Sequence, residues 1–345
     1  MNALTTTIIS HRTYSSFIEK VDHSAFHRIE WLKTIESYYS VELVTLGYYD
    51  GDQLIAVSPL QKKKIGPFTL WGAPLRKCAT PPSTPFCIPV EKSLDIIESF
   101  LGWCKNHNAK FLQITIPNSI DFTSIVTDNT EELNNLEMRL TEPLANIYKR
   151  LSKGTRWCIR KAVRQGVRLH WRSSIKVIDE QKLLLKDTYG NIRNNASSTY
   201  PIEFYQTIFN KRDDINLRIL SASHEGETVA SLWVFFDKST CYYWDAASRY
   251  KARDLYANHL LVWSLIKWAH KNNFKTFDFV GGSVGGRGGS RPGIGRFKSS
   301  MGATGKNYHI AYWYSPLLQF ALKSYRSYSS IRHRARTKIQ KIKPS

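Results

Sequence analysis

The sequence predicts an α/β protein built from two tandem domains, and three observations lead to this prediction. The chain has 345 residues, more than a single hydrophobic core usually serves. A β-hairpin pattern occurs in each half, where an amphipathic helix and another strand follow it. The helix-to-strand junctions also match, since Trp103 and Trp268 each stand seven residues before a lysine, Lys110 or Lys275. Duplication of one unit explains these three observations. The alternative is that the two helix-to-strand junctions resemble each other by chance.

The composition indicates a folded protein with an anionic partner. Hydrophobic residues make up 42% of the chain, and the net charge is +21. Such a charge favours nucleic acid, an acidic membrane surface, or a phosphorylated or nucleotide-linked substrate. The five cysteines form no CxxC pair, so they signal neither a zinc site nor a disulfide framework. The chain starts without a signal-peptide pattern and has no apolar run of transmembrane length, which predicts a cytoplasmic protein that could dock on the inner face of the membrane.

The first half opens its repeated unit with a hairpin. Residues 41–49 and 53–60 read as strands joined by an Asp-Gly-Asp turn. Apolar residues at helical spacing from Leu94 to Cys104 predict the amphipathic helix. A strand follows it, and the polar stretch 117–136 then predicts a loop or a short helix.

The second half repeats this unit and adds one strand. Strands are predicted at 217–223, 228–236 and 240–246, a long helix at 255–271, and a last strand at 274–280. The two halves therefore share an order of elements that predicts two similar domains.

A long basic helix, predicted at 145–166, opens the second domain. The boundary is expected near residue 140, giving an N-terminal domain of residues 1–140 and a C-terminal domain of residues 141–315. Residues 316–345 are a basic tail with eight lysines or arginines and no acid. That tail either lies on anionic lipid or RNA as a basic amphipathic helix or docks on its own domain.

Segment 281–302 is rich in glycine and basic residues, and it follows the last predicted strand. Glycine lets the backbone approach a ligand closely, while arginine and lysine supply the charge that a phosphate or an oxyanion needs. We therefore expect a substrate-facing loop in which Arg291 and Arg296 contact an anionic group. A flexible linker is the other interpretation of this composition.

Four basic residues form one stripe on the predicted helix 145–166: Arg156, Arg160, Lys161 and Arg164. Arg160 and Lys161 are expected to bind a substrate diphosphate or a tRNA backbone. A solvated helix face is the alternative.

Two aspartates on predicted strands are further candidates for substrate contact. Asp278 lies just before the glycine-rich segment, where it could act as a base toward an acceptor amine or cap glycine amides. Asp245 lies in the central strand 240–246, where it could line an acyl cleft or be a satisfied buried carboxylate.

Motifs of several other enzyme classes are missing from the sequence. It contains no GxxxxGK(S/T), HExxH or GxSxG pattern. We therefore expect neither metal nor serine-hydrolase chemistry, and no metal site.

The order of central strands, long helix and strand in the second half resembles the core of the GNAT acyltransferase fold. In that fold the pyrophosphate of acyl-CoA sits on backbone amides at a glycine-rich turn before the helix. Aligned on Leu260 and Leu261, the family pattern (Q/R)xxGxG/A meets Leu255 at its first glycine and keeps only Ala257 in its second small position. The resemblance therefore makes acyl-CoA a less favoured donor.

Four further segments make nearly the whole chain resemble the Fem family: FHRIEWLKTI from Phe26, RLSKGTRWCIRKAVRQGV from Arg150, DFVGG from Asp278, and GIGRFKSSMGA from Gly293. Members of that family resemble two fused GNAT domains, so the implied fold is two tandem GNAT-like domains with central mixed β-sheets flanked by helices. They transfer amino acids from aminoacyl-tRNA to peptidoglycan precursors, and related proteins occur in exopolysaccharide gene clusters. The long helical-hairpin insertion of some members is missing, which favours the compact, FemX-like form.

By this resemblance, Phe297 and Lys298 match a Phe-Lys pair whose lysine stabilises the negatively charged tetrahedral intermediate. The implied activity is transfer of an aminoacyl or acyl group to an amine or hydroxyl of a cell-envelope precursor. The implied donor is aminoacyl-tRNA, no cofactor is bound, and the acceptor is a nucleotide- or lipid-linked anion. A non-catalytic protein that binds RNA or an anionic membrane is the alternative, motivated by the charge and the tail.

Overall fold

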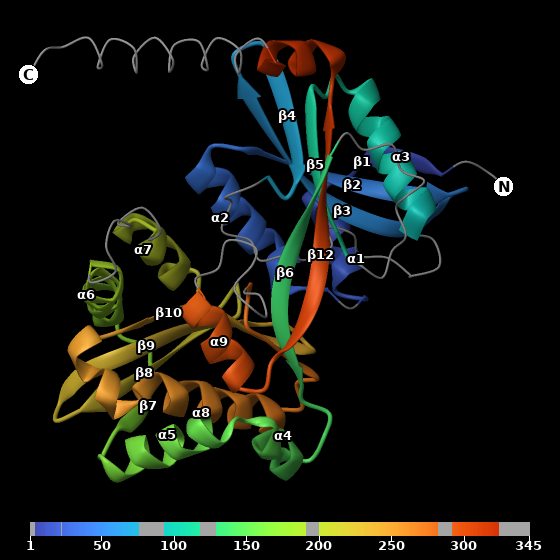
Figure 1. Cartoon of the computed structure of the whole chain (residues 1–345). Coiled ribbons are helices and arrows are strands. Elements are labelled where there is room, and N and C mark those ends of the chain that lie inside the picture. Colours follow the sequence, from blue (N-terminus) through green and yellow to red (C-terminus); the bar gives the residue numbers. More distant parts are fainter. Residues whose placement is uncertain are drawn as a thin grey trace, which may run out of the picture.

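The computed structural model describes residues 4–21, 23–75, 93–117, 129–190, 200–281 and 292–323. These residues form one large mixed β-sheet with helices on both faces (Figure 1). The twelve strands of this sheet are, in chain order, β1 (Thr5–Ile8), β2 (Glu42–Asp50), β3 (Gln53–Ile65), β4 (Phe68–Ala73), β5 (Phe111–Pro117), β6 (Asn129–Arg139), β7 (Arg168–Arg172), β8 (Leu217–His224), β9 (Glu227–Phe236), β10 (Thr240–Ser248), β11 (Thr276–Asp278) and β12 (Thr304–Tyr314).

The helices of the described chain include two short 3₁₀ turns that Figure 1 leaves unlabelled. In chain order they are α1 (His11–Ile18), η1 (Ala25–His27), α2 (Ile29–Tyr39), α3 (Ser93–Asn106), α4 (Leu144–Arg150), α5 (Lys153–Arg164), α6 (Lys176–Gly190), α7 (Ile202–Asn210), η4 (Tyr250–Leu255), α8 (Ala257–Lys271) and α9 (Pro292–Ser300).

The order of the strands confirms the expected repeat. The sheet runs β1-β2-β3-β4-β5-β12-β6-β11-β10-β9-β8-β7, so each half contributes an antiparallel meander that ends in a parallel pair. In the first half β4 pairs in parallel with β5, and in the second half β10 pairs in parallel with β11. The α/β class and the tandem arrangement were therefore predicted correctly.

The two expected sheets are joined edge to edge by an exchange of strands. The C-terminal strand β12 pairs with β5 of the first half, and β6 pairs with β11 of the second half. β6 and β12 also pair antiparallel with each other, and they form the long strands at the centre of Figure 1. Each half thus completes the sheet of the other, while the boundary near residue 140 stays a prediction.

Three hydrophobic cores stabilise this arrangement. One lies under α3 in the first half, and one lies between the second-half strands and α4, α5 and α8. The third is shared by both halves, because residues of α2 pack against residues of α7, β9 and β10. There the rings of Trp31 and Phe235 lie 5.0 Å apart, and the rings of Phe26 and Tyr242 lie 5.0 Å apart. Aromatic burial of this kind fixes the halves relative to each other.

In the polar stretch 117–136, which was predicted as loop or short helix, residues 129–136 are instead the start of β6, and residues 118–128 lie outside the described residues. The side chains of this strand include Asn, Glu and Arg, which have low strand propensity. Ladder hydrogen bonds on both sides hold it nevertheless, with Leu136 opposite Gly305 and Met138 opposite Phe277. Tertiary pairing has overridden local preference here.

The predicted basic helix at 145–166 is two helices, α4 and α5. Leu151 is extended with ψ of 140° and is buried, so it interrupts the helix to reach the core. Ser152 then starts α5, because its hydroxyl accepts a hydrogen bond from the Thr155 N–H at 3.0 Å. The basic stripe lies on α5 alone.

Two elements around the glycine-rich segment also differ from the prediction. Strand β11 is shorter than the predicted 274–280, and residues 292–300 form helix α9 instead of a loop. Residues 282–291, including Arg291, lie outside the described residues.

Candidate active site

A pocket of about 570 Å³ opens where β10 and β11 part from each other. The two strands pair only from Thr240 opposite Thr276 to Tyr242 opposite Asp278. Beyond Tyr242, β10 no longer pairs with β11 but still pairs with β9. That pairing is irregular between Tyr243 and Asp245. The pocket is lined by the end of β10, by η4 and the first turn of α8, and by α9.

Lys298 of α9 lies in the wall of this pocket, and its ammonium group is held by backbone. The residue is only 6% exposed. Its Nζ donates to the carbonyl oxygens of Phe279 at 2.6 Å, Val280 at 3.0 Å and Gly281 at 2.9 Å. Since an ammonium has three donors, all of them are used. The Tyr243 ring lies 5.5 Å from Nζ and adds a cation–π contact.

The three carbonyls belong to a strained turn at the end of β11. Val280 has φ of 51° and Gly281 has φ of 74°, and a left-handed conformation is unfavourable for a β-branched residue. The Asp278 carboxylate accepts from the Val280 N–H at 2.7 Å, and the Asn135 side-chain oxygen accepts from the Gly281 N–H. The turn is thus held from both sides, through its N–H groups and through its carbonyls.

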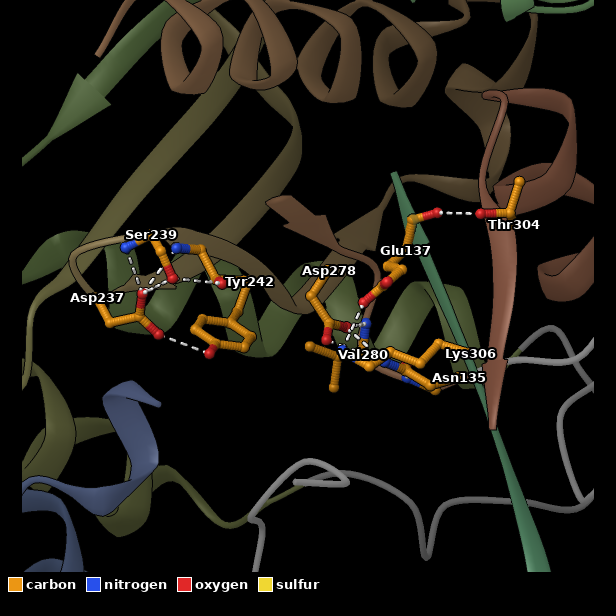
Figure 2. Close-up of polar contacts among 11 residues, drawn as sticks. Asn135, Glu137, Asp237, Ser239, Tyr242, Asp278, Val280, Thr304 and Lys306 are labelled. Atoms are coloured by element: carbon orange, nitrogen blue, oxygen red, sulfur yellow. Dashed lines mark hydrogen bonds and ion pairs between the residues drawn. The ribbon is translucent and has the colours of Figure 1, made fainter. Parts of the chain in front are cut away.

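Asn135 and Asp278 form the centre of the buried polar cluster in Figure 2. The Asn135 amide donates to both carboxylate oxygens of Asp278, at 3.0 and 2.9 Å. Lys306 and Glu137 lie beside this pair and form an ion pair at 3.2 Å. Asp278 therefore has the contacts of a cap on the turn, which is one of the two roles expected from the sequence.

Burial shifts the pKa values of both charged residues at this turn. Desolvation raises the pKa of Asp278 to about 6, and hydrogen bonds from Val280 and Asn135 partly oppose this rise. Desolvation lowers the pKa of Lys298 to about 8, and the Asp278 charge partly opposes this fall. Both groups lie near the end of β11 and both titrate closer to neutrality than usual, a pattern found at functional sites.

Asp245 of β10 lines the same pocket. Its Oδ2 accepts hydrogen bonds from the Tyr205 hydroxyl at 2.6 Å and from the Gln181 amide at 3.0 Å. Burial raises the pKa of this carboxyl, against the effect of these two donors. Asp245 is therefore a satisfied carboxylate that also lines the pocket, and its contact with an acyl group stays a prediction.

Phe297 and His259 pack against each other in the wall of the pocket. Phe297 is partly buried on α9, and its ring lies 5.1 Å from the ring of His259, nearly perpendicular to it. His259 lies in the first turn of α8, is half-buried and lines the pocket. No motif in the sequence marks His259, because only the fold brings the start of α8 beside α9.

The basic stripe of α5 reaches the pocket through Tyr256. The Lys161 Nζ lies 5.0 Å from the ring centre of Tyr256, which lines the pocket. Arg160 is exposed, and one guanidinium nitrogen lies 3.5 Å from the Tyr148 hydroxyl. Neither residue forms an ion pair with an acid within the described parts of the chain. Lys161 is thus available to an anionic ligand beside the pocket, and Arg160 is available to one on the exposed face of α5.

The remaining predicted residues are placed only in part. Arg296 is exposed on α9, one residue before Phe297. The tail beyond residue 323 lies outside the described residues, as Arg291 does. In the described ranges, no three His, Cys, Asp or Glu side chains gather as metal ligands would, and no helix is both long and apolar enough to span a bilayer.

Comparison with known families decides what kind of domain carries this pocket. Residues 149–289 match the family model described as an acetyltransferase (GNAT) domain. This part of the chain is a GNAT acyltransferase domain. The match includes β10, η4, α8 and β11, so most of the pocket of this acyltransferase lies within the matched domain. The predicted GNAT superfamily and the acyltransferase class are thereby confirmed.

Solved structures extend the fold similarity to nearly the whole chain. The crystal structure of FemX has a TM-score of 0.73 at 13% identity, covering 92% of this chain and 99% of FemX. L-PGS from Bacillus licheniformis has a TM-score of 0.57 at 13% identity, covering 90% of this chain and 95% of its own. A tandem GNAT protein from the clavulanic acid biosynthesis pathway has a TM-score of 0.52 at 10% identity, covering 90% and 98%. No curated protein is significantly similar to this acyltransferase in sequence.

Proposed function

We propose that this acyltransferase moves an aminoacyl or acyl group onto an amine or hydroxyl of a cell-envelope precursor, a peptidoglycan precursor or an exopolysaccharide. The observation that carries the proposal is the pocket where β10 and β11 separate, which is lined by Asp245 and His259 of the matched GNAT domain and by Lys298 of α9. A precursor of this kind is anionic, being nucleotide- or lipid-linked. The charge of +21 and the unpaired cations of α5 suit such a substrate.

We propose aminoacyl-tRNA as the donor, with acyl-CoA less favoured. The turn before α8 supports this choice, because it contains Leu255 at the position of the first glycine that lets a pyrophosphate approach backbone amides. Tyr256 of the same turn has φ of 54° and lines the pocket. One structural neighbour, from Agrobacterium fabrum, is named a putative lysylphosphatidylglycerol synthetase, which fits aminoacyl chemistry in this fold.

Lys298 retains a proposed part in catalysis, through its charge and its position. The ammonium places a positive charge in the pocket wall, where it would favour an oxyanion. Direct contact with that oxyanion would require exchange of one of its three carbonyl partners. Phe297 is proposed to shape the same wall by packing on His259.

The other charged residues are proposed to hold the substrates. Arg160, Lys161 and the exposed Arg296 would contact phosphates of the donor or acceptor, and Arg291 is proposed to do the same from the neighbouring segment. Asp245 would orient an acceptor amine in the pocket. Contact with an anionic membrane surface belongs to the same proposal, since a lipid-linked acceptor would be presented there.

Labelled donors test the proposal. Purified protein is incubated with labelled alanyl-tRNA or labelled acetyl-CoA and a UDP-linked peptidoglycan precursor or a lipid-linked one, and transfer is measured. The expected result is transfer from alanyl-tRNA, lost on Asp245→Asn and kept on Glu225→Gln, an exposed control in the β8–β9 turn. Salt-dependent binding of tRNA or anionic vesicles with no product from either donor would instead support the non-catalytic alternative.

A further inference from the structure

His259 is a polar pocket residue for which the roles above give no chemistry. It packs against Phe297 of the Phe-Lys pair, and Lys298 lines the same pocket. Tyr256 packs on it from its own element, with ring centres 5.9 Å apart. A polar ring held in the wall of a reaction pocket is well placed to touch the reacting group.

The surroundings of the ring indicate which nitrogen carries the proton. Nδ1 is buried and has no hydrogen-bond partner within the described residues. A buried N–H without an acceptor is costlier than a buried lone pair, and such orphaned N–H groups are rare. The neutral ring therefore keeps its proton on Nε2. Because Nδ1 is buried, the accessible edge of this half-buried ring is the one that carries Nε2.

The ring is also neutral under ordinary conditions. Desolvation lowers the pKa of His259, and no neighbouring charge contributes to this change. A neutral imidazole with Nε2–H is a hydrogen-bond donor and not an acceptor at that atom. Neutral histidine can polarise a carbonyl in this way.

The three N–H donors of Lys298 are already used, so an oxyanion in the pocket would need a hydrogen bond from another donor. Acyl transfer creates negative charge on the carbonyl oxygen, and a preorganised N–H donor is the usual way to stabilise it. The three N–H bonds of Lys298 point to the carbonyls of Phe279, Val280 and Gly281. The His259 Nε2–H has no partner among the described residues and lies in the wall of the same pocket.

We propose that the Nε2–H of His259 donates the hydrogen bond that stabilises the oxyanion of the acyl-transfer intermediate, with Lys298 as a positioning residue behind it. The inference rests on the proposed function. The acceptor nitrogen or oxygen attacks the acyl carbon, and the carbonyl electron pair moves to the oxygen that His259 contacts. The acceptor then loses its proton to water, and the carbonyl re-forms as the ester C–O bond to the donor breaks. The departing oxygen of the donor takes a proton from water and becomes a hydroxyl. His259 keeps its own proton throughout.

Three substitutions separate a donor at Nε2 from other roles. His259→Gln keeps an amide N–H near the position of Nε2, whereas His259→Asn places it near Nδ1 and His259→Leu removes it. We expect kcat for alanyl transfer to fall about 100-fold or more in the Leu and Asn variants, as for loss of an oxyanion donor. The Gln variant should retain at least ten times the kcat of the Asn variant. Equal losses in Gln and Asn, or a Leu variant within about threefold of wild type, would overturn the proposal.

Stability and pH provide readouts that a merely structural residue would not give. His259→Leu should unfold at the same urea concentration as wild type or a higher one, because it removes a buried unpaired nitrogen. The ratio of wild-type to Gln-variant kcat should stay constant from pH 6 to 8.5. The titratable and charged groups that share the pocket with His259 are Tyr243, Asp245, Arg249, Arg253, Tyr256 and Lys298. These groups are present in wild type and in His259→Gln, so their titration does not change the ratio of the two kcat values. If that ratio rises as the His259 imidazole loses its proton, His259 is a general base.

Nitrogen NMR tests the tautomer without any substrate. In protein with ¹⁵N-labelled histidine, the resonances lost in His259→Gln identify this ring. We expect the Nε2 shift of a protonated nitrogen and the Nδ1 shift of a bare one, and the reverse pattern would refute the inference even if transfer occurs. If wild type transfers nothing from either donor while the tautomer is as expected, the proposed function fails instead.

Discussion

Lys298→Met tests how the end of β11 is held. The substitution keeps the length and much of the volume of the side chain but removes the ammonium that binds the carbonyls of Phe279, Val280 and Gly281. At ordinary costs of about 2 kcal/mol for each buried unpaired carbonyl, the variant loses about 6 kcal/mol. The change also removes a buried charge, whose pKa is lowered from 10.5 to about 8, and this relieves about 3 kcal/mol.

The expected net effect is a decrease of about 3 kcal/mol in the free energy of unfolding, as an order of magnitude. Urea titration followed by tryptophan fluorescence measures it. Lys306→Met is the matched control, because Lys306 is half-exposed and pairs with Glu137, so its loss should cost less than about 1 kcal/mol. If Lys298→Met unfolds with the same midpoint as wild type while activity is lost, the ammonium serves the reaction and not the turn, and the reasoning from the three carbonyls is refuted.

Three further predictions concern the turn and the basic surface. Because the folded pKa of Asp278 is about 6 and its ordinary value is 3.8, the protonated form stabilises the fold below about pH 4, and about 3 kcal/mol of this stability is lost as pH rises through 6. In urea titrations, the free energy of unfolding of wild type should therefore fall by this amount relative to that of Asp278→Asn as pH rises. The same pH dependence in both proteins would contradict the prediction. Val280→Gly should leave the urea midpoint unchanged or raise stability by about 1 kcal/mol by relieving the left-handed valine, whereas a clear loss of stability would argue against strain there. Replacing Arg160 and Lys161 by glutamines should weaken tRNA binding in filter assays and flatten its salt dependence, and unchanged binding would remove both residues from the proposed substrate contacts.

The repeat was readable from sequence because its signals are local. Strands β2, β3, β8 and β9 are short apolar runs next to tight turns, and α3 and α8 carry apolar stripes, so local composition and turn chemistry suffice. Strand β6 was not readable, because its polar residues are held by neighbours from the far end of the chain. The joining of the two sheets into one could not be predicted either, because it depends on the long-range pairing of β12.

The sequence pointed to several residues of the candidate site but not to their contacts. Phe297 and Lys298 were identified by family resemblance, and Asp245 and Asp278 by their place on strands that end at the pocket. The capture of the Lys298 ammonium by three carbonyls depends on a left-handed turn at Val280, which a β-branched residue would not suggest. His259 was missed for a similar reason, since its place beside Phe297 depends on how α8 and α9 pack.

The central claim, that acyl transfer takes place between β10 and β11, is tested most directly by blocking that space. Ala246 lines the pocket and carries no charge, so Ala246→Trp fills the pocket and leaves its polar groups in place. The measurement is transfer of labelled alanine from alanyl-tRNA by this variant, with its thermal midpoint compared with wild type. We predict that transfer is lost while the midpoint is kept. Transfer at the wild-type rate by a folded Ala246→Trp protein would contradict the account.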